Sequence, residues 1–543
     1  MSETDGLRGD ERWGTTAKLV RDAAERFGDR PAIVDASLTT GVTLSFAELY
    51  QRVREAARGF LVAGTKRGDR IAIWAPNIHE WVVVLLGAHL AGAVLVPLNT
   101  RFKGTEAGFI LDQSAATMLF TVSGFLDTDY VGLLKEGGFD AASLGEIVIL
   151  RGDAPEGTIT WSDFCARGLD ATEVDVDRRL ASVKPDDLSD ILFTSGTTGM
   201  PKGAMCTHGQ TVRAFADWAD VVGLREGDRY LIVNPFFHAF GYKAGILACL
   251  MTGATMFPHA VFDPVAVLER VRDDRISMVP GPPALFQAML NAPGLDAYDL
   301  TSLRLAVTGA AVIPVELIVE MRDRLGFERV ITGYGLTEAC GIATMCRHDD
   351  DPETIATTSG RAIPGVEVEI VDTEGKEVPR GEPGEVVVRG YNVMRGYLDD
   401  PDQTAEAIDR DGWLHTGDIG VMDDRGYLRI TDRLKDMFIV GGFNAYPAEI
   451  ESLLLAHPQI AQAAVVGVPD DRLGEVGVAF VVAKTGETID PDGVVAWARD
   501  RMANYKVPRS VEVVDALPLN ASGKVLKFEL RERATAGAGA GTA

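Results

Sequence analysis

The chain has 543 residues, of which 46% are hydrophobic and 24% charged, and it carries a net charge of −26 at pH 7. This length exceeds one ordinary hydrophobic core and predicts at least two domains. The acidic balance argues against a nucleic-acid-binding surface and an anionic-membrane surface, because both would repel the chain.

The amino-terminal stretch MSETDGLRGDERWG is polar and predicts a loose arm without a signal peptide. The longest apolar run, WVVVLLGAHLAGAVLVPL at 81–98, approaches the length of a membrane span. It is interrupted by His89, by glycines and by Pro97. We therefore predict a buried helix followed by a buried strand, and no membrane span.

Between about residues 70 and 335, short apolar runs alternate with helical patterns. The runs DILFT, YLIV, ISMV, LRLAVT and RVITG read as strands. The segment THGQTVRAFADWADVVG reads as a helix with one apolar face (Val212, Phe215, Ala216 and Ala219) and with Gly223 as its stop. This alternation predicts a mostly parallel sheet with helices on both faces, whose ligands bind at the carboxyl ends of the strands.

From about residue 360 the pattern changes to alternating strands with glycine turns, which predicts a small β subdomain. After Arg433 a separate helix–strand–strand–helix unit follows, and the low-complexity end ATAGAGAGTA predicts a flexible tail. The predicted fold class is α/β: a large amino-terminal domain of parallel sheets flanked by helices plus a small β subdomain, and a small α+β carboxy-terminal domain. We place these domains at 1–432 and 437–543, with the boundary between them at 433–436.

The stretch FTSGTTGMPKG, residues 193–203, directly follows a predicted strand. Its glycines allow backbone N–H groups close to a ligand and its hydroxyls add donors, which suits phosphate. The spacing differs from the G-x-x-x-x-G-K-[ST] loop, so the phosphate would be held in another fold.

The five cysteines show no C-x-x-C spacing, which is typical of inert core residues in a reducing cytoplasm, and we expect a cytoplasmic protein.

Four further stretches follow this loop in order: NPFFHAFGY, YGLTEA, WLHTGD and LPLNASGK, with TDRLKDMFIVGGFNAYPAEIE between the last two. Together with the first they resemble the adenylate-forming superfamily of acyl-CoA synthetases, peptide synthetase adenylation domains and luciferases. The resemblance covers almost the whole chain. It implies ATP-driven activation of a carboxylic acid as an acyl-adenylate, release of pyrophosphate and capture of the acyl group by a thiol, with ATP, Mg²⁺ and coenzyme A as cofactors.

The resemblance also implies the roles of individual residues. Glu338 matches the Mg²⁺-associated carboxylate, Thr337 lies near the α-phosphate, and His238 lies where the acyl pocket meets the nucleotide. Tyr334 matches the ring that stacks on adenine, and Asp418 and Arg433 match the ribose contacts. The remaining nucleotide-binding positions are Thr194, Ser195, Gly196, Thr197, Thr198, Gly199 and Lys202 in the phosphate loop, Gly309, Ala310 and Ala311 in a backbone shelf, and Gly335 beside Tyr334.

Lys524 is the expected catalytic residue. In the superfamily it bridges the substrate carboxylate and the α-phosphate, where an ammonium group stabilises the developing charge. The resemblance further implies that the carboxy-terminal domain, 437–543, is mobile. It rotates after the first step about a hinge at 433–436, which contains Lys435, so that Gly441 and Gly442 line the tunnel for pantetheine. Two departures from the family pattern are Asp432 before the hinge arginine and Leu519 where a basic residue is common.

Plain structural roles remain open for the same residues. Lys524 and Lys202 could be solvated charges, Glu338 a helix-terminus carboxylate, Asp418 a turn residue and His238 a packed core residue.

Tyr242 and Lys243 also have two interpretations. Either both lie near the acid pocket, or Lys243 marks the solvated end of a helix, which is the preferred interpretation for this lysine.

The segments around 234–255 and 279–290 closely resemble actinobacterial ligases for HIP, the indanedione propanoate left from steroid ring breakdown. This predicts an acid–CoA ligase for a steroid-derived propanoate, in lipid and steroid (cholesterol) catabolism. The alternatives are a medium- or long-chain fatty acid–CoA ligase and an inactive nucleotide-binding protein of the same fold. The expected partner is a small-molecule carboxylic acid, without nucleic acid or a membrane span, and a homodimer stays open.

Overall fold

The computed structural model describes residues 14–37, 41–194, 201–309, 313–433, 436–440, 443–470, 473–499, 501–502, 504–519 and 525–539. The chain divides into two compact units. The first comprises residues 1–368 and 388–414, and the second comprises 369–387 and 415–543. The hinge predicted at 433–436 stays a prediction.

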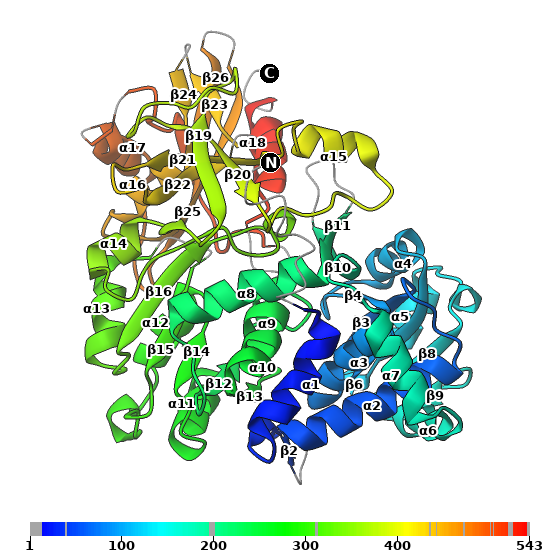
Figure 1. Ribbon diagram of the computed structural model, residues 1–543. Helices are drawn as coiled ribbons and strands as arrows, with labels where there is room; N and C mark the ends of the chain where they lie inside the picture. Colours follow the sequence, from blue (N-terminus) through cyan, green and yellow to red (C-terminus); the bar gives the residue numbers. More distant parts are fainter. Residues whose placement is uncertain are drawn as a thin grey trace. The chain divides into compact units, whose positions relative to one another are not determined.

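Two large sheets form the first unit (Figure 1). In the seven-stranded sheet the order is β11 (Lys202–Thr207), β10 (Leu188–Thr194), β4 (Val94–Pro97), β3 (Arg70–Trp74), β5 (Ala116–Thr121), β8 (Glu146–Ile149) and β9 (Ile159–Thr160). Its strands pair in parallel from β10 to β9, whereas β10 and β11 form an antiparallel hairpin.

The nine-stranded sheet has the order β18 (Arg361–Ala362), β17 (Thr344–Met345), β16 (Arg329–Tyr334), β15 (Leu305–Thr308), β14 (Met278–Pro280), β12 (Arg229–Ile232), β13 (Thr255–Pro258), β1 (Pro31–Asp35) and β2 (Val42–Ser45). The pairs from β16 through β1 are parallel. The predicted α/β architecture of parallel sheets is therefore confirmed, with two such sheets in the first unit.

Helices flank both sheets. The longer ones are α1 (Thr16–Phe27), α2 (Phe46–Val62), α3 (His79–Leu90), α4 (Gly104–Gln113), α7 (Glu173–Ser182), α8 (His208–Val222), α11 (Pro264–Asp273), α12 (Pro283–Leu290) and α13 (Val315–Asp323). The shorter ones are α5 (Tyr130–Glu136), α6 (Trp161–Arg167), α9 (Ala239–Gly241), the π-helix η3 (Tyr242–Leu247), α10 (Ala248–Thr252), α14 (Pro352–Thr357) and α15 (Pro401–Ala407).

The apolar run at 81–98 forms α3 and β4, as predicted. Helix α3 contacts β4 of one sheet and β1 of the other, so it lies between the two sheets. Eleven of its residues are buried, which explains why it is apolar on every side. Among the described residues, no helix is both long and apolar enough to cross a membrane.

Helix α8 begins and ends as its sequence predicts. Thr207 caps its amino terminus by accepting a hydrogen bond from the Gln210 N–H, in a capping box, and Gly223 ends it in the left-handed conformation. The helix packs against η3, α10, α1 and the β10–β11 hairpin. It therefore braces the two segments that carry the phosphate loop and the NPFFHAFGY motif.

The second unit holds most of a four-stranded sheet, β19 (Val366–Val371), β20 (Gly384–Gly390), β21 (Leu414–Met422) and β22 (Leu428–Arg433). It also holds a five-stranded sheet of β24 (Phe443–Ala445), β23 (Phe438–Val440), β26 (Gly474–Ala483), β25 (Ile460–Asp470) and β27 (Ser510–Val513). Its helices are α16 (Pro447–Leu455), α17 (Pro491–Arg499) and α18 (Lys527–Gly539). The prediction of a flexible tail was wrong for its first part, since α18 continues to Gly539.

Candidate functional site

The predicted phosphate loop connects β10 to β11. Thr194 and Lys202 are directly paired across this hairpin and so form the base of the loop. Both side chains are half-buried. The predicted phosphate-binding residues between them, Ser195, Gly196, Thr197, Thr198 and Gly199, lie outside the described residues.

Glu338 lies within hydrogen-bonding distance of Thr194, although 144 positions separate them in sequence. Glu338 and Thr337 belong to the short 3₁₀-helix η5 (Thr337–Ala339), which follows β16. The Thr194 hydroxyl donates to Glu338 Oε1 at 3.2 Å, and the Tyr397 hydroxyl donates to the same atom at 3.0 Å. The structure thus brings together two predicted site residues and adds a third that the sequence did not reveal.

These oxygen donors suit magnesium. A hard cation prefers carboxylate and hydroxyl oxygens, and both hydrogen bonds to Glu338 use Oε1, so neither uses Oε2. Burial raises the pKa of the Tyr397 phenol well above its usual range, and the nearby Glu338 carboxylate raises it further. Tyr397 therefore stays protonated and acts as a donor to Glu338.

Lys202 is held by neighbouring side chains. Its ammonium hydrogen-bonds to Gln403 Oε1 and lies 5.3 Å from the centre of the Tyr397 ring. Gln403 belongs to α15, whose amino terminus is capped by Asp400. The alternative of a purely solvated loop lysine is therefore wrong, and its contact with phosphate stays a prediction.

The segment after β16 requires glycine at position 335. A Cβ atom built on Gly335 would lie 2.2 Å from the backbone oxygen of Gly341, which is far inside van der Waals contact. Tyr334 ends β16 with a half-buried side chain. Gly309 directly follows β15, while Ala310 and Ala311 lie outside the described residues.

His238 is exposed, so the alternative of a packed core histidine is wrong. Its Nδ1 atom accepts a hydrogen bond from the backbone N–H of Phe240 at 3.2 Å and caps the short helix α9. A neutral ring whose Nδ1 accepts carries its proton on Nε2.

Asp418 and Arg433 are cross-strand partners in the second unit. They pair directly between β21 and β22, which is consistent with the prediction that both contact one ribose. Asp418 is 4% exposed, and its backbone N–H donates to the Thr416 hydroxyl at 3.1 Å. The side chain of Arg433 and the residues Lys435, Gly441, Gly442 and Lys524 lie outside the described part of the chain.

The preferred interpretation of Lys243, a solvated helix end, was wrong. Lys243 is fully buried, and its Nζ lies 2.9 Å from Oδ1 of the equally buried Asp190. Burial alone would lower the pKa of the ammonium, but the attraction of Asp190 outweighs it and the pKa is raised. Tyr242 is also fully buried, with its hydroxyl 3.4 Å from Asp190 Oδ2.

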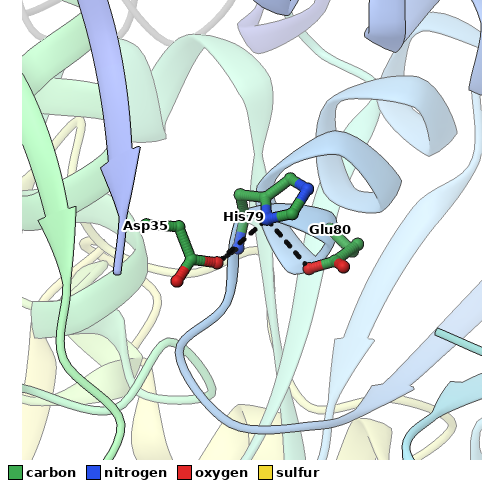
Figure 2. Close-up of side chains that lie close together, drawn as sticks. All are labelled: Asp35, His79 and Glu80. Carbon is green, nitrogen blue, oxygen red and sulfur yellow. Dashed lines mark hydrogen bonds and ion pairs between the residues drawn. The ribbon is translucent and has the colours of Figure 1, made fainter. Parts of the chain in front are cut away.

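A second cluster of metal-ligating residue types joins Asp35 of β1 to His79 and Glu80 of α3 (Figure 2). Arg151 already supplies a positive charge there, with its Nη2 2.6 Å from both Asp35 Oδ2 and Glu80 Oε2. Burial would raise the pKa of Asp35, but hydrogen bonds from His79 and Ser37 lower it well below its usual range. The cluster is therefore an ion-pair network that fastens β1 to α3.

All five cysteines are free, and four of them are buried, as expected for core residues. Cys340 differs from the others because its sulfur hydrogen-bonds to Lys243 Nζ at 3.4 Å.

Comparison with known proteins agrees with this geometry. The AMP-binding enzyme family matches residues 20–398, and the AMP-binding enzyme C-terminal domain matches 449–524. The 3-[(3aS,4S,7aS)-7a-methyl-1,5-dioxo-octahydro-1H-inden-4-yl]propanoyl:CoA ligase of Rhodococcus jostii is 50% identical over 95% of this chain and 98% of its own. The ligase of the same name from Mycobacterium tuberculosis is 52% identical over 89% and 93%.

Among solved structures, ATP-bound MatB from Rhodopseudomonas palustris is 31% identical, with a TM-score of 0.84 over 95% of this chain and 98% of its own. The anthranilate CoA ligase AuaEII, in complex with anthranoyl-AMP, is 26% identical, with the same TM-score over 97% and 98%. The chain therefore belongs to the AMP-binding enzymes of the adenylate-forming superfamily, as an AMP-forming acid–CoA ligase that uses ATP, Mg²⁺ and coenzyme A.

Proposed function

We propose that this ligase activates a bicyclic, steroid-derived propanoate of the indanedione type, HIP. The observation that carries the proposal is that two ligases named for this acid are at least 50% identical to the chain over most of both lengths. A medium-chain acyl-CoA ligase from Mus musculus is 34% identical, so similarity to a fatty acid enzyme is weaker.

We also propose how the described residues act on ATP. A bound Mg²⁺ would neutralise phosphate charge, and Glu338 would hold it because its carboxylate is already oriented by Thr194 and Tyr397. Thr194 and Lys202 hold the base of the loop that would close over the outer phosphates. Within this net-acidic chain, these groups would lower the repulsion between the acid and ATP.

The carboxy-terminal residues complete the proposal. Lys524 would bridge the substrate carboxylate and the α-phosphate while the carboxylate oxygen attacks phosphorus and pyrophosphate leaves. Coenzyme A thiolate would then attack the acyl carbon and release AMP. Support for Lys524 comes from the motif LPLNASGK and from the family match that ends at this residue.

A panel of free acids tests the substrate assignment. CoA-dependent AMP release is measured with the indanedione propanoate, with its analogue in which both ketones are reduced, with octanoate and with ferulate. We expect the diketone to have the highest kcat/KM, about 100-fold above octanoate, because a site that is selective for two fused rings would pack poorly around a linear chain. Equal or higher kcat/KM for octanoate would overturn the substrate assignment and leave the reaction class intact.

A cytoplasmic location and a homodimer remain predictions. The five free cysteines support a reducing compartment. Light scattering of the purified protein decides between monomer and dimer.

A further inference from the structure

Three side chains that are far apart in sequence meet in the core of the first unit. Lys243 of η3, Asp190 of β10 and Cys340, which follows η5, are each fully buried. The Lys243 ammonium lies 2.9 Å from Asp190 Oδ1 and donates to Cys340 Sγ at 3.4 Å. One ammonium group therefore joins three separate chain segments.

Stability alone does not explain this ion pair. The cost of removing two charges from water usually cancels their attraction, and replacing a buried pair with apolar side chains is often neutral. Leaving one charge without its partner, by contrast, is strongly destabilising. A buried pair of this kind therefore calls for an explanation in what it positions.

The three segments are the ones that carry the candidate site. Asp190 lies four residues before Thr194 on the same strand, and Cys340 lies two residues after Glu338. The Thr194–Glu338 hydrogen bond and the Asp190–Lys243–Cys340 contacts thus join β10 to the η5 turn at two places. Two separate joints fix an orientation, whereas one hydrogen bond leaves a pivot.

The backbone at Cys340 needs such support. Its φ of +59° is left-handed, a strained conformation for a residue with a side chain, which persists only where the surroundings enforce it. Besides Lys243, Thr211 of α8 lies 3.6 Å from Cys340 Sγ and 3.5 Å from Asp190 Oδ2. The strained turn is therefore held on both sides by the same buried network.

We infer that Lys243 is a positioning residue for adenylate formation: its buried ammonium sets the η5 turn, and with it the Glu338 carboxylate, against the end of β10. The inference rests on the proposed role of Glu338. It predicts that loss of the buried charges slows the step that uses ATP and spares the step that uses coenzyme A, because Glu338 would act on the triphosphate only.

The main test replaces both charges. The double variant D190N/K243M removes the ion pair without leaving an unpaired charge, whereas K243M alone leaves Asp190 buried and unpaired. We expect K243M to lower the thermal midpoint strongly and the double variant to recover most of it. In the double variant, ATP–pyrophosphate exchange should fall about 10- to 100-fold, the range expected from a misplaced group. Thioester formation from supplied acyl-adenylate should stay within about threefold, and MgATP affinity by calorimetry should fall several-fold.

A matched buried pair provides the control. Arg304 and Asp228 are 7% and 4% exposed, ion-paired, and located at the amino ends of β15 and β12, away from the strand ends that carry the candidate site. The variant D228N/R304M should show a similar change in stability with exchange and MgATP affinity unchanged. If both double variants lose exchange equally, Lys243 has only a structural role and the inference fails.

Two further variants keep the outcomes distinct. C340A removes the sulfur contact and leaves the ion pair in place, so it tests the inference even if the double variant does not fold. For C340A we expect ATP–pyrophosphate exchange to be several-fold slower and the KM for the acid to be unchanged. E338Q is assayed in parallel. If E338Q catalyses ATP–pyrophosphate exchange at the wild-type rate, the proposed role of Glu338 fails. If E338Q is impaired while C340A and folded D190N/K243M catalyse this exchange at the wild-type rate, only the inference about Lys243 is overturned.

Discussion

Two buried histidines predict that acid destabilises the first unit. Thr16 bridges them, with its hydroxyl oxygen 2.7 Å from Nδ1 of His89 and 2.7 Å from Nδ1 of His208. His89 Nε2 lies 2.8 Å from the Ser189 carbonyl, so it donates there and its Nδ1 accepts from Thr16. Thr16 then accepts a hydrogen bond from Nδ1 of His208, and burial, which lowers the pKa of both rings, keeps both neutral in the folded protein near neutral pH.

The size of the effect follows from the pKa of His89. Burial lowers this pKa from 6.5 to about 4, while nearby Asp190 raises it and Lys243 lowers it. Since the folded pKa lies below the unfolded one, the stabilisation is complete above about pH 6.5 and is lost as the pH falls toward 4. At about 1.4 kcal/mol per pH unit, His89 alone accounts for about 3 kcal/mol. Burial also lowers the pKa of His208, which adds in the same direction.

Urea unfolding followed by tryptophan fluorescence between pH 7 and pH 4.5 measures this slope. Trp74, Trp81 and Trp218 are fully buried in the first unit and report on it. H89Q should flatten the pH dependence of the unfolding free energy, whereas H348Q, at an exposed position, should leave it unchanged. A curve for H89Q parallel to that of the wild type would refute the reasoning.

Three further predictions concern the site. K524A should lose adenylate formation by at least about 100-fold and keep thioester formation from supplied acyl-adenylate, because the ammonium stabilises charge only in the first step; equal loss in both half-reactions would contradict the assignment. D418N should raise the KM for ATP more than that for 2′,3′-dideoxy-ATP, since the removed carboxylate accepts from the ribose hydroxyls; an identical rise for both nucleotides would rule this out. G335A should lower the unfolding free energy by about 1–3 kcal/mol, because the new Cβ overlaps the Gly341 oxygen, and an unchanged urea midpoint would show that the turn can shift.

The sequence predicted the elements with strong periodicity. Helix α8, with its Gly223 stop, and the α3–β4 segment both appear where the pattern places them. In each case the signal is local, since capping residues and apolar periodicity act within a few turns of chain.

The contacts between distant segments could not be predicted. Nothing in the local pattern around Tyr397 shows that its hydroxyl reaches Glu338, because that contact depends on how β11 and the chain near α15 pair in three dimensions. Lys243 was misinterpreted because a charged residue after an aromatic cluster usually reaches solvent. A usable signal did exist: Asp190 lies within the apolar strand SDILFT, and a charge buried there requires a partner of opposite sign.

A single-turnover experiment with ATP, Mg²⁺ and the indanedione propanoate, without coenzyme A, tests the two-step reaction directly. We expect one enzyme-bound acyl-adenylate and one pyrophosphate per site, and then conversion to the acyl-CoA thioester and free AMP when coenzyme A is added. Formation of ADP and phosphate, or of thioester without a preceding adenylate, would contradict this two-step reaction.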